Sequence, residues 1–315
     1  MGLDNKEFPD VIRGTDRALH PEGVAWDPSR SAFLVGSLRY GTVSVVTPDG
    51  ATSTLVKHEN LIATGGIRAD VERNRLLVTY DDVYAGPGGL LSAGSTPETA
   101  GRHAGLGIFE LDSGKLVQLV DLGWHSGLHL ANDLALDADG NAYVTDSFAP
   151  TLFRVDPAGN ASVFLEDDAF DAPTTDGLPE VGLNGIAYHP DGYLLTVRYD
   201  TGELLRVPLD GTPRATKVDL DTPVIGADGI ALRPDGDLVV ATNTIRSAGY
   251  DGAFLLRSED GWKSATAVRD ERWPDASPTT IAVTPHGDYI LSSSLQVLFW
   301  SGGQETSDGF VLRRH

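Results

Sequence analysis

The sequence predicts an all-β fold, a single six-bladed β-propeller that occupies residues 1–315. Three observations support this prediction. Strand-like segments recur with a period of about 40 to 50 residues, which is typical of propeller blades. Most repeats open with a similar short phrase, and several contain an Asp-Gly turn. No segment of useful length has the apolar spacing of a helix. The opening phrases are Glu22-Gly23-Val24-Ala25, Asn132-Asp133-Leu134-Ala135, Asn184-Gly185-Ile186-Ala187, Asp228-Gly229-Ile230-Ala231 and Thr279-Thr280-Ile281-Ala282.

Each repeat contains a first strand, a turn, a second strand and a third strand. Asp-Gly between strand-like runs favours a hairpin. In the last repeat His286-Gly287 takes this place, so we expect His286 to be a surface turn residue without a catalytic role. The Asp-Gly turns are Asp139-Gly140, Asp191-Gly192 and Asp235-Gly236. The third strands are expected at residues 43–46, 108–111, 152–155, 204–207, 254–257 and 310–313.

The second repeat begins at Gly65-Gly66-Ile67 and contains a long loop from about Tyr84 to Gly105. This loop is rich in Gly, Ser, Pro and Thr and has no strand pattern. It either covers the channel mouth as a lid or is an inert excursion, and we favour the lid. The last repeat lacks a fourth strand. We expect Val11-Ile12-Arg13-Gly14 to supply it, which closes the ring and removes exposed sheet edges.

Composition narrows the classes of function. The chain has 315 residues, of which 41% are hydrophobic, enough for a large core. The net charge of −21 disfavours nucleic acid and anionic membranes as partners. The absence of cysteine excludes disulfides, thiol nucleophiles and zinc-thiolate sites. No apolar run of about 18 residues occurs, and residues 1–10 lack the layout of a signal peptide. We therefore expect a cytoplasmic protein that acts on a small molecule.

The opening phrases of four repeats contain a polar residue in the same position: Glu22, Asn132, Asn184 or Asp228. In a propeller the first strand of each blade lines the central channel, so these side chains meet at one mouth. Asn or Asp before Gly also caps turns, but capping explains neither Glu22 nor the common register. Hard oxygen ligands favour Ca²⁺, and Mg²⁺, Mn²⁺ and Zn²⁺ stay open as alternatives. Four protein oxygens leave room for water or substrate, because Ca²⁺ usually takes about six to eight ligands.

The second strands return to the same mouth, where their last residues are expected to form an outer ring: Ser37, Tyr80, Asp146, Arg198, Thr242 and Ser293. Among these we expect Tyr80, Asp146 and Arg198 to contact the substrate. His20 and His129 precede two of the inner-ring residues and are expected near the mouth. Either histidine would suit proton transfer, since its pKa is near neutrality. A packing role is the simpler alternative for both.

The segment from Asn132 to Asp146, together with Glu22-Gly23, Asn184-Gly185 and Asp228-Gly229, resembles the family of gluconolactonases and senescence marker protein (regucalcin). It is also similar to diisopropyl fluorophosphatase and, more distantly, to paraoxonases. The resemblance runs from about Glu22 onwards. It implies a catalytic divalent metal, usually Ca²⁺, held by the residues matching Glu22, Asn184 and Asp228. In the phosphatase-like branch the residue matching Asn132 is a further ligand, and in the sugar-lactonase branch it contacts the substrate.

One departure bears on the substrate. Animal gluconolactonases have an Arg two residues before the Asn that matches Asn132, and this chain has Leu130. A less polar lactone or ester is therefore expected, unless Arg198 substitutes for the missing Arg.

The expected activity is metal-dependent hydrolysis of a lactone or ester, with phosphotriesters as a related substrate class. The metal would act as Lewis acid and Asp228 as base or nucleophile. Two alternatives stay open: a metal-dependent cyclase or isomerase with a dedicated substrate, and a Ca²⁺-binding propeller without catalysis. The strictosidine synthase-like branch is disfavoured, because this chain keeps all four ligand positions.

Overall fold

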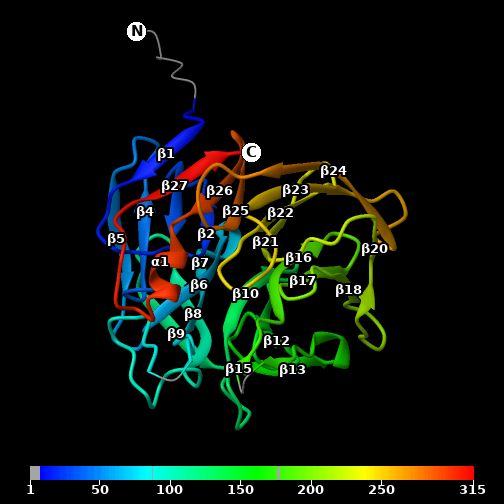
Figure 1. The fold of residues 1–315 in the computed structure, drawn as a ribbon, viewed down its shortest axis with the longest axis horizontal. Helices are drawn as coiled ribbons and strands as arrows, with labels where there is room; N and C mark the ends of the chain where they lie inside the picture. Colours follow the sequence, from blue (N-terminus) through cyan, green and yellow to red (C-terminus); the bar gives the residue numbers. More distant parts are fainter. Residues whose placement is uncertain (1–7, 87, 176–177) are drawn as a thin grey trace.

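Apolar strands separated by Gly-containing turns form six antiparallel sheets arranged in a ring around a central axis (Figure 1). The computed structural model describes residues 8–86, 88–175 and 178–315, so most of the N-terminal segment considered above, residues 1–7, lies outside the described residues. The predicted six-bladed β-propeller is confirmed. No helix in these ranges is long and apolar enough to cross a membrane.

The first three blades follow one another along the chain. Blade 1 contains β2 (Val24–Asp27), β3 (Ala32–Val35), β4 (Thr42–Val46) and β5 (Thr52–Lys57). Blade 2 contains β6 (Ala63–Asp70), β7 (Arg75–Asp81), β8 (Ala104–Glu110) and β9 (Leu116–Asp121), with the 3-10 helix η1 (Val71–Arg73) in its first turn. Blade 3 contains β10 (Ala131–Leu136), β11 (Ala142–Asp146), β12 (Thr151–Val155) and β13 (Ala161–Glu166).

The second half of the ring has additional short elements. The 3-10 helix η2 (Asp168–Phe170) and the pair β14 (Thr174–Thr175) and β15 (Leu178–Pro179) precede blade 4. Blade 4 contains β16 (Leu183–His189), β17 (Tyr193–Arg198), β18 (Leu204–Pro208) and β19 (Thr216–Lys217). Blade 5 contains β21 (Ala227–Leu232), β22 (Leu238–Thr242), β23 (Gly252–Arg257) and β24 (Ser264–Arg272), to which β20 (Asp219–Leu220) adds in parallel. Blade 6 contains β25 (Pro278–Thr284), β26 (Gly287–Ser292), β27 (Phe310–Arg314) and β1 (Val11–Gly14).

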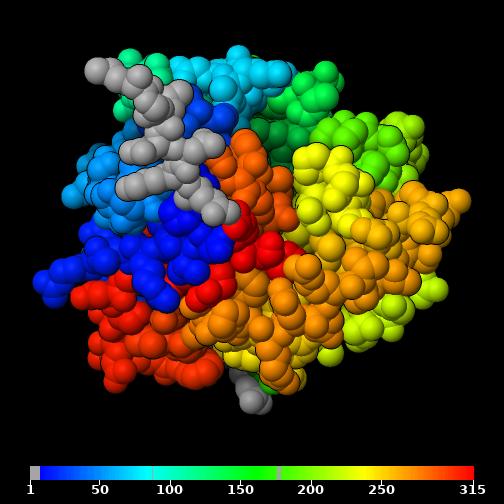
Figure 2. All heavy atoms as spheres, turned by 90° about the horizontal axis from the view of Figure 1, so that it is seen from above, coloured from blue at the N-terminus to red at the C-terminus, as the bar shows by residue number. Residues whose placement is uncertain are grey.

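The ring closes as predicted, because the N-terminal strand β1 completes the C-terminal blade. Its residues pair antiparallel with β27, from Val11 opposite Arg313 to Gly14 opposite Phe310. Figure 2 shows the blue N-terminal residues against the red C-terminal ones. A Cβ atom at Gly14 would come within 2.1 Å of the Phe310 ring, so only glycine fits there. Closure makes β27 an inner strand of blade 6 and β1 its outer strand.

The turns and third strands also lie where the sequence places them. Gly140 and Gly192 have φ values of +85° and +83°, a conformation that favours glycine. His286 is exposed in its turn, and its ring stacks on Phe8 at 4.0 Å, in agreement with a surface role.

Side chains from facing blades form the core. Each of the six spaces between neighbouring blades holds an apolar cluster of buried residues, and a seventh cluster lies over one mouth of the channel. This mouth cluster contains Leu38, Ala63, Val83, Leu91, Leu130, Leu295 and Leu298. Two of its members belong to α1 (Leu295–Trp300), a short helix that the sequence reading did not identify.

Candidate metal centre

The first strands of five blades begin with a β-bulge. In β10, Ala131 lies opposite Asp146 and Leu134 lies opposite Val144. Two residues of β10 lie between these pairs, whereas only one residue of β11 does. The same irregularity recurs at the start of β6, β16, β21 and β25. A bulge bends a strand and redirects a side chain. Asn132, Asn184 and Asp228 occupy these bulges.

Glycine in the repeated phrase allows the first strands to approach one another near the axis. A Cβ atom at Gly185 would come within 2.4 Å of the Asp228 carbonyl oxygen, and one at Gly23 within 2.0 Å of the Gly65 carbonyl oxygen. Both contacts are with backbone atoms of the next blade. The glycines therefore bring the polar residues beside them close together at the mouth.

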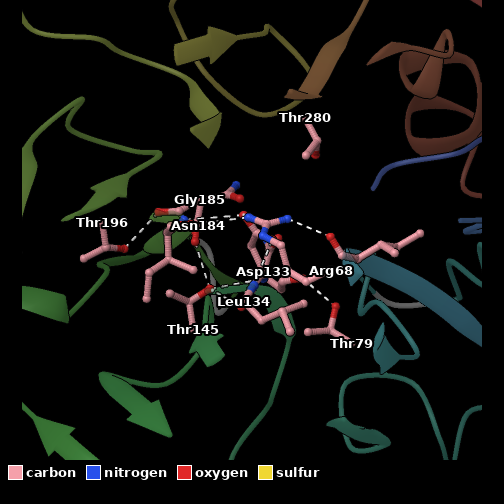
Figure 3. A network of polar contacts seen from close by, with 12 residues as sticks. Arg68, Thr79, Asp133, Leu134, Thr145, Asn184, Gly185, Thr196 and Thr280 are labelled. Atoms are coloured by element: carbon pink, nitrogen blue, oxygen red, sulfur yellow. Dashed lines mark hydrogen bonds and ion pairs between the residues drawn. The ribbon is translucent and has the colours of Figure 1, made fainter. Parts of the chain in front are cut away.

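The four predicted ligands, Glu22, Asn132, Asn184 and Asp228, all line one cavity. We call these four residues the floor. Hydroxyl groups of neighbouring blades hold its backbone: Thr79 Oγ1 donates to the Asn132 carbonyl at 2.6 Å, and Thr145 Oγ1 donates to the Asn184 carbonyl at 2.8 Å (Figure 3). Thr279 Oγ1 likewise donates to the Glu22 carbonyl at 2.7 Å.

Glu22 has a buried carboxylate oxygen, Oε2, with no hydrogen-bond partner among the described residues. Burial raises the pKa of Glu22 well above its ordinary value, and the carboxyl groups of Asp228, Asp133 and Asp81 raise it further. A buried oxygen without a partner costs free energy unless a ligand satisfies it. Cation binding would satisfy it and favour the charged form.

Asp228 is the second floor carboxylate. Burial raises its pKa to about 7, although hydrogen bonds from Asn243 and Asn184 lower it. Asn243 Nδ2 donates to Asp228 Oδ2 at 2.5 Å. A carboxyl group with a pKa near neutrality suits proton transfer at physiological pH.

The two floor amides complete the donor set. Asn132 Nδ2 donates to Ser147 Oγ at 2.9 Å, so its Oδ1 is the atom available to the cavity. The described residues contain no group of three or more His, Cys, Asp or Glu side chains arranged for a metal. A cation here would depend on two carboxylates and two amide oxygens. These residues fit a hard cation such as Ca²⁺.

Below the floor, an ion pair lies across the central channel. Arg68 Nη2 lies 3.2 Å from Asp133 Oδ2, and Arg68 Nη1 donates to the Ile67 carbonyl at 2.8 Å (Figure 3). Asp133 Oδ1 accepts from the Leu134 amide at 2.8 Å. The guanidinium group counteracts the upward shift in the pKa of Glu22 and of Asp133. The pair thus offsets one of the buried negative charges beside the floor.

The cavity above the floor has mostly apolar walls. It contains about 590 Å³ that protein atoms do not occupy, and this volume includes solvent space at its open mouth. Leu130, the residue that departs from the animal gluconolactonases, is one of the wall residues. The apolar wall residues are Leu38, Val83, Leu130, Phe148, Val181, Ile245, Leu295 and Phe299.

The predicted outer ring is wrong in its placement of Tyr80, Asp146 and Arg198. None of the three lines the cavity. Tyr80 Oη donates to the Val120 carbonyl at 3.2 Å, within its own blade. Arg198 pairs with Asp200 at 2.6 Å.

Successive side chains of a strand point to opposite faces, so an error of one position reverses the assignment. Three polar residues that do line the cavity each follow a predicted ring member directly in the sequence. They are Asp81 after Tyr80, Tyr199 after Arg198 and Asn243 after Thr242. The other predicted ring members, Ser37, Thr242 and Ser293, donate to the carbonyls of Leu19, Tyr250 and Pro21.

The two predicted histidines also lie off the cavity. His129 Nδ1 lies 2.6 Å from Asp146 Oδ2, and this hydrogen bond raises the pKa of His129. His20 Nε2 accepts from the Ser307 amide at 3.0 Å, and burial lowers the pKa of His20. Both side chains are buried. The geometry agrees with the packing alternative.

The loop after Tyr84 is pinned and does not line the cavity in its described part. Asp82 holds it through Ser95 Oγ at 2.5 Å and Thr99 Oγ1 at 2.6 Å. Its Leu91 is fully buried with Leu295 and Leu298 of α1. The described part of the loop therefore reaches the mouth through Leu91 and supports α1, which lines the cavity.

Comparison with known proteins gives a fold-level result. No family model matches the chain, and no curated protein sequence matches it significantly. Among solved structures, the allergen Mala s 1 of Malassezia sympodialis is 19% identical, with 97% of this chain and 95% of that chain covered and a TM-score of 0.71. A gluconolactonase of Xanthomonas campestris is 17% identical, with coverage of 96% and 89% and a TM-score of 0.60.

The calcium-binding protein regucalcin of Agrobacterium tumefaciens is 15% identical, with coverage of 96% and 95% and a TM-score of 0.62. The chain shares its fold with a gluconolactonase and with regucalcin. This agrees with the resemblance stated from the sequence. At these identities the likeness shows the fold alone.

Proposed function

We propose that the protein is a divalent-metal-dependent hydrolase of a lactone or ester, with Ca²⁺ as the metal. The observation that supports this most is the floor itself. Four oxygen-bearing side chains from four blades meet at one cavity, and Glu22 Oε2 has no partner among the described residues. Two carboxylates would match the charge of a divalent cation, and two neutral amides would add oxygen dipoles without further charge.

When bound, the cation would supply Lewis-acid polarisation of the substrate carbonyl. The chain's own residues would do the rest. Asn243 Nδ2 donates to one oxygen of Asp228 and would hold this carboxylate in place at the cavity. Asp228 would accept a proton from the attacking water and return it to the leaving alkoxide. Alternatively it would add to the carbonyl carbon and displace the alkoxide, and water would then hydrolyse the resulting anhydride to regenerate the carboxylate. The apolar walls would limit the access of bulk water.

Two measurements test this proposal: the divalent metal content of the purified protein and its hydrolysis of candidate substrates. Purified protein is analysed by plasma mass spectrometry, and hydrolysis of a lactone, an aryl ester and a phosphotriester is measured before and after chelation. We expect about one divalent metal per chain and activity that chelation abolishes and Ca²⁺ restores. Hydrolysis that is indifferent to chelation would contradict the proposal. Mg²⁺, Mn²⁺ and Zn²⁺ are added in parallel to identify the metal that restores activity best.

A second candidate is a Ca²⁺-binding propeller without catalysis. The specific observation in its favour is the shared fold with regucalcin, which is described as a calcium-binding protein. Stoichiometric Ca²⁺ without turnover of any of the three substrate classes would favour it.

A further inference from the structure

We infer that the cavity accepts a lactone or ester with a hydrocarbon chain of several carbons, which packs against α1, and prefers it to a polyhydroxylated sugar lactone. The reacting carbonyl in this inference rests on the proposed function. The preference for an apolar chain rests separately on the walls of the cavity.

The walls offer apolar contact on several sides. Leu38 and Val83 follow the second strands of blades 1 and 2, whereas Phe148 and Ile245 follow those of blades 3 and 5. Helix α1 adds Leu295 and Phe299, and Leu130 and Val181 lie in the segments that lead into β10 and β16. Burial of an alkyl chain against such a surface is favourable in proportion to the area removed from water.

Most amide and phenol groups near the floor are engaged with one another, whereas the carboxylate oxygens Glu22 Oε2 and Asp81 Oδ1 have no partner among the described residues. Tyr199 Oη donates to Asn243 Oδ1 at 2.7 Å and accepts from the Arg246 amide at 3.0 Å. Asn243 Nδ2 donates to Asp228 Oδ2 and to the Pro278 carbonyl. Asn132 Nδ2 is engaged by Ser147. The Asn243 amide and the Tyr199 phenol therefore have their donors in use, and Asn132 has one of its two amide donors in use.

A sugar lactone would bring several hydroxyl groups into this cavity. Arg246 is the one cationic side chain among the described lining residues, and its guanidinium already donates to the Pro179 carbonyl at 3.3 Å. Buried hydroxyl groups without partners are strongly disfavoured. Selection against a substrate that leaves polar groups unpaired reaches large factors in enzymes.

The wall formed by α1 is held in place. Trp300 Nε1 donates to the Ile245 carbonyl at 3.0 Å, and Leu295 and Leu298 are buried in the mouth cluster. Phe299 is half-buried and faces the cavity. Because its neighbours anchor the helix, Phe299 is the position at which the wall can be changed with the least effect on the fold.

The first experiment uses a series of δ-lactones with alkyl substituents of zero to about six carbons, compared with glucono-δ-lactone. We expect KM to fall about threefold for each added methylene until the cavity is filled. We expect kcat/KM for glucono-δ-lactone to be at least about 100-fold below that of the hexyl-substituted lactone. Equal or better turnover of glucono-δ-lactone would overturn the inference.

A binding measurement separates this inference from the proposed function. Hydrolysis-resistant δ-lactams with and without a hexyl chain are titrated by calorimetry into the protein, with Ca²⁺ and after chelation. Tighter binding of the hexyl lactam in both conditions, by at least about 30-fold, supports the apolar wall even if no substrate is hydrolysed. Hydrolysis of lactones without any preference for the hexyl lactam would support the function and overturn the inference.

Variants in α1 locate the preference. Phe299→Asn should raise KM for the hexyl lactone by about tenfold or more and raise KM for the unsubstituted lactone by a much smaller factor. Phe299→Leu should restore most of the difference. Val297→Asn is the matched control, since Val297 lies in the same helix, is half-exposed and does not line the cavity. If Val297→Asn raised KM for the hexyl lactone as much as Phe299→Asn, the effect would come from α1 as a whole and the assignment to Phe299 would be wrong.

Discussion

The two ends of the central channel differ in chemistry although the same ring of first strands builds both. At one end the floor presents two carboxylates and two amides to a cavity. At the other end a second cavity is lined by apolar residues of all six first strands, such as Val24, Ile67 and Ile281, with Arg68 as its one charged lining residue among those described. The ring therefore closes at that end without a carboxylate or an amide side chain among the described lining residues. The polar floor is not a requirement of the fold, which supports a functional reason for it.

The largest expected effect tests this difference directly. Asp228→Asn keeps the shape of the side chain and removes its charge and its basicity. We expect kcat/KM for the best lactone or ester to fall by at least about 10³-fold. Ile67→Val, a change at the apolar end, should leave kcat/KM within about twofold. Similar losses from both variants would mean that the two ends do not differ in function.

The next effect concerns the ion pair that separates the two ends. Arg68→Met leaves Asp133 buried without its charged partner, and the side chain of Asp133 is only 5% exposed. We expect the free energy of unfolding to fall by about 3 kcal/mol, measured by denaturant titration. The double variant Arg68→Met, Asp133→Asn should recover most of this loss, because it leaves no uncompensated charge. A loss in the double variant as large as in the single one would show that the guanidinium acts through packing alone.

Ca²⁺ binding should have a somewhat smaller effect on stability. A ligand present at about 100 times its Kd stabilises the folded state by about 2.7 kcal/mol. For a chain of this length we expect Tm to rise by about 5 °C after Ca²⁺ is added to chelated protein. Glu22→Gln removes one floor carboxylate and should abolish most of the rise. Asp49→Asn, a change in an exposed turn, is the control and should preserve it. An unchanged rise in Glu22→Gln would place the cation elsewhere.

The floor could be predicted from the sequence because one property determined it: residues in the same register of a circular repeat meet at the axis. Glu22, Asn132, Asn184 and Asp228 share that register, and the structure brings them to one cavity. The second-strand residues were misplaced by one position. Residues two positions apart in a strand lie on the same face. Asp81 and Ser147 therefore share a face with Thr79 and Thr145, the threonines that hold the floor backbone.

The walls could not be predicted in the same way. Phe148, Val181, Ile245 and α1 come from segments between strands, where no period relates one blade to the next. Their places depend on tertiary contacts such as the burial of Leu91 against α1. Repetition therefore predicted the part of the site that would bind a cation, and the structure was needed for the part that would select a substrate.

The smallest effect is a pH dependence that distinguishes the floor from the rest of the molecule. The pKa of Asp228 is about 7 in the folded chain and near 3.8 when unfolded. Between these values the folded state binds more protons than the unfolded state, so this residue makes unfolding easier as pH rises from about 4 to about 7. Protons and Ca²⁺ compete for the same carboxylate. The Kd for Ca²⁺, measured by calorimetry, should fall by up to about tenfold per pH unit from pH 5 to pH 7 and level off above it.

Asp133→Asn is the informative control for this pH dependence. It removes a buried carboxyl group beside the floor and retains Asp228, so the slope of Ca²⁺ affinity against pH should persist with its plateau at a slightly lower pH, since Asp133 raises the pKa of both Glu22 and Asp228. Affinity that did not change between pH 5 and pH 7 would mean that the cation does not bind through Asp228. In that case the polar end of the channel would differ from the apolar end in its buried charge alone.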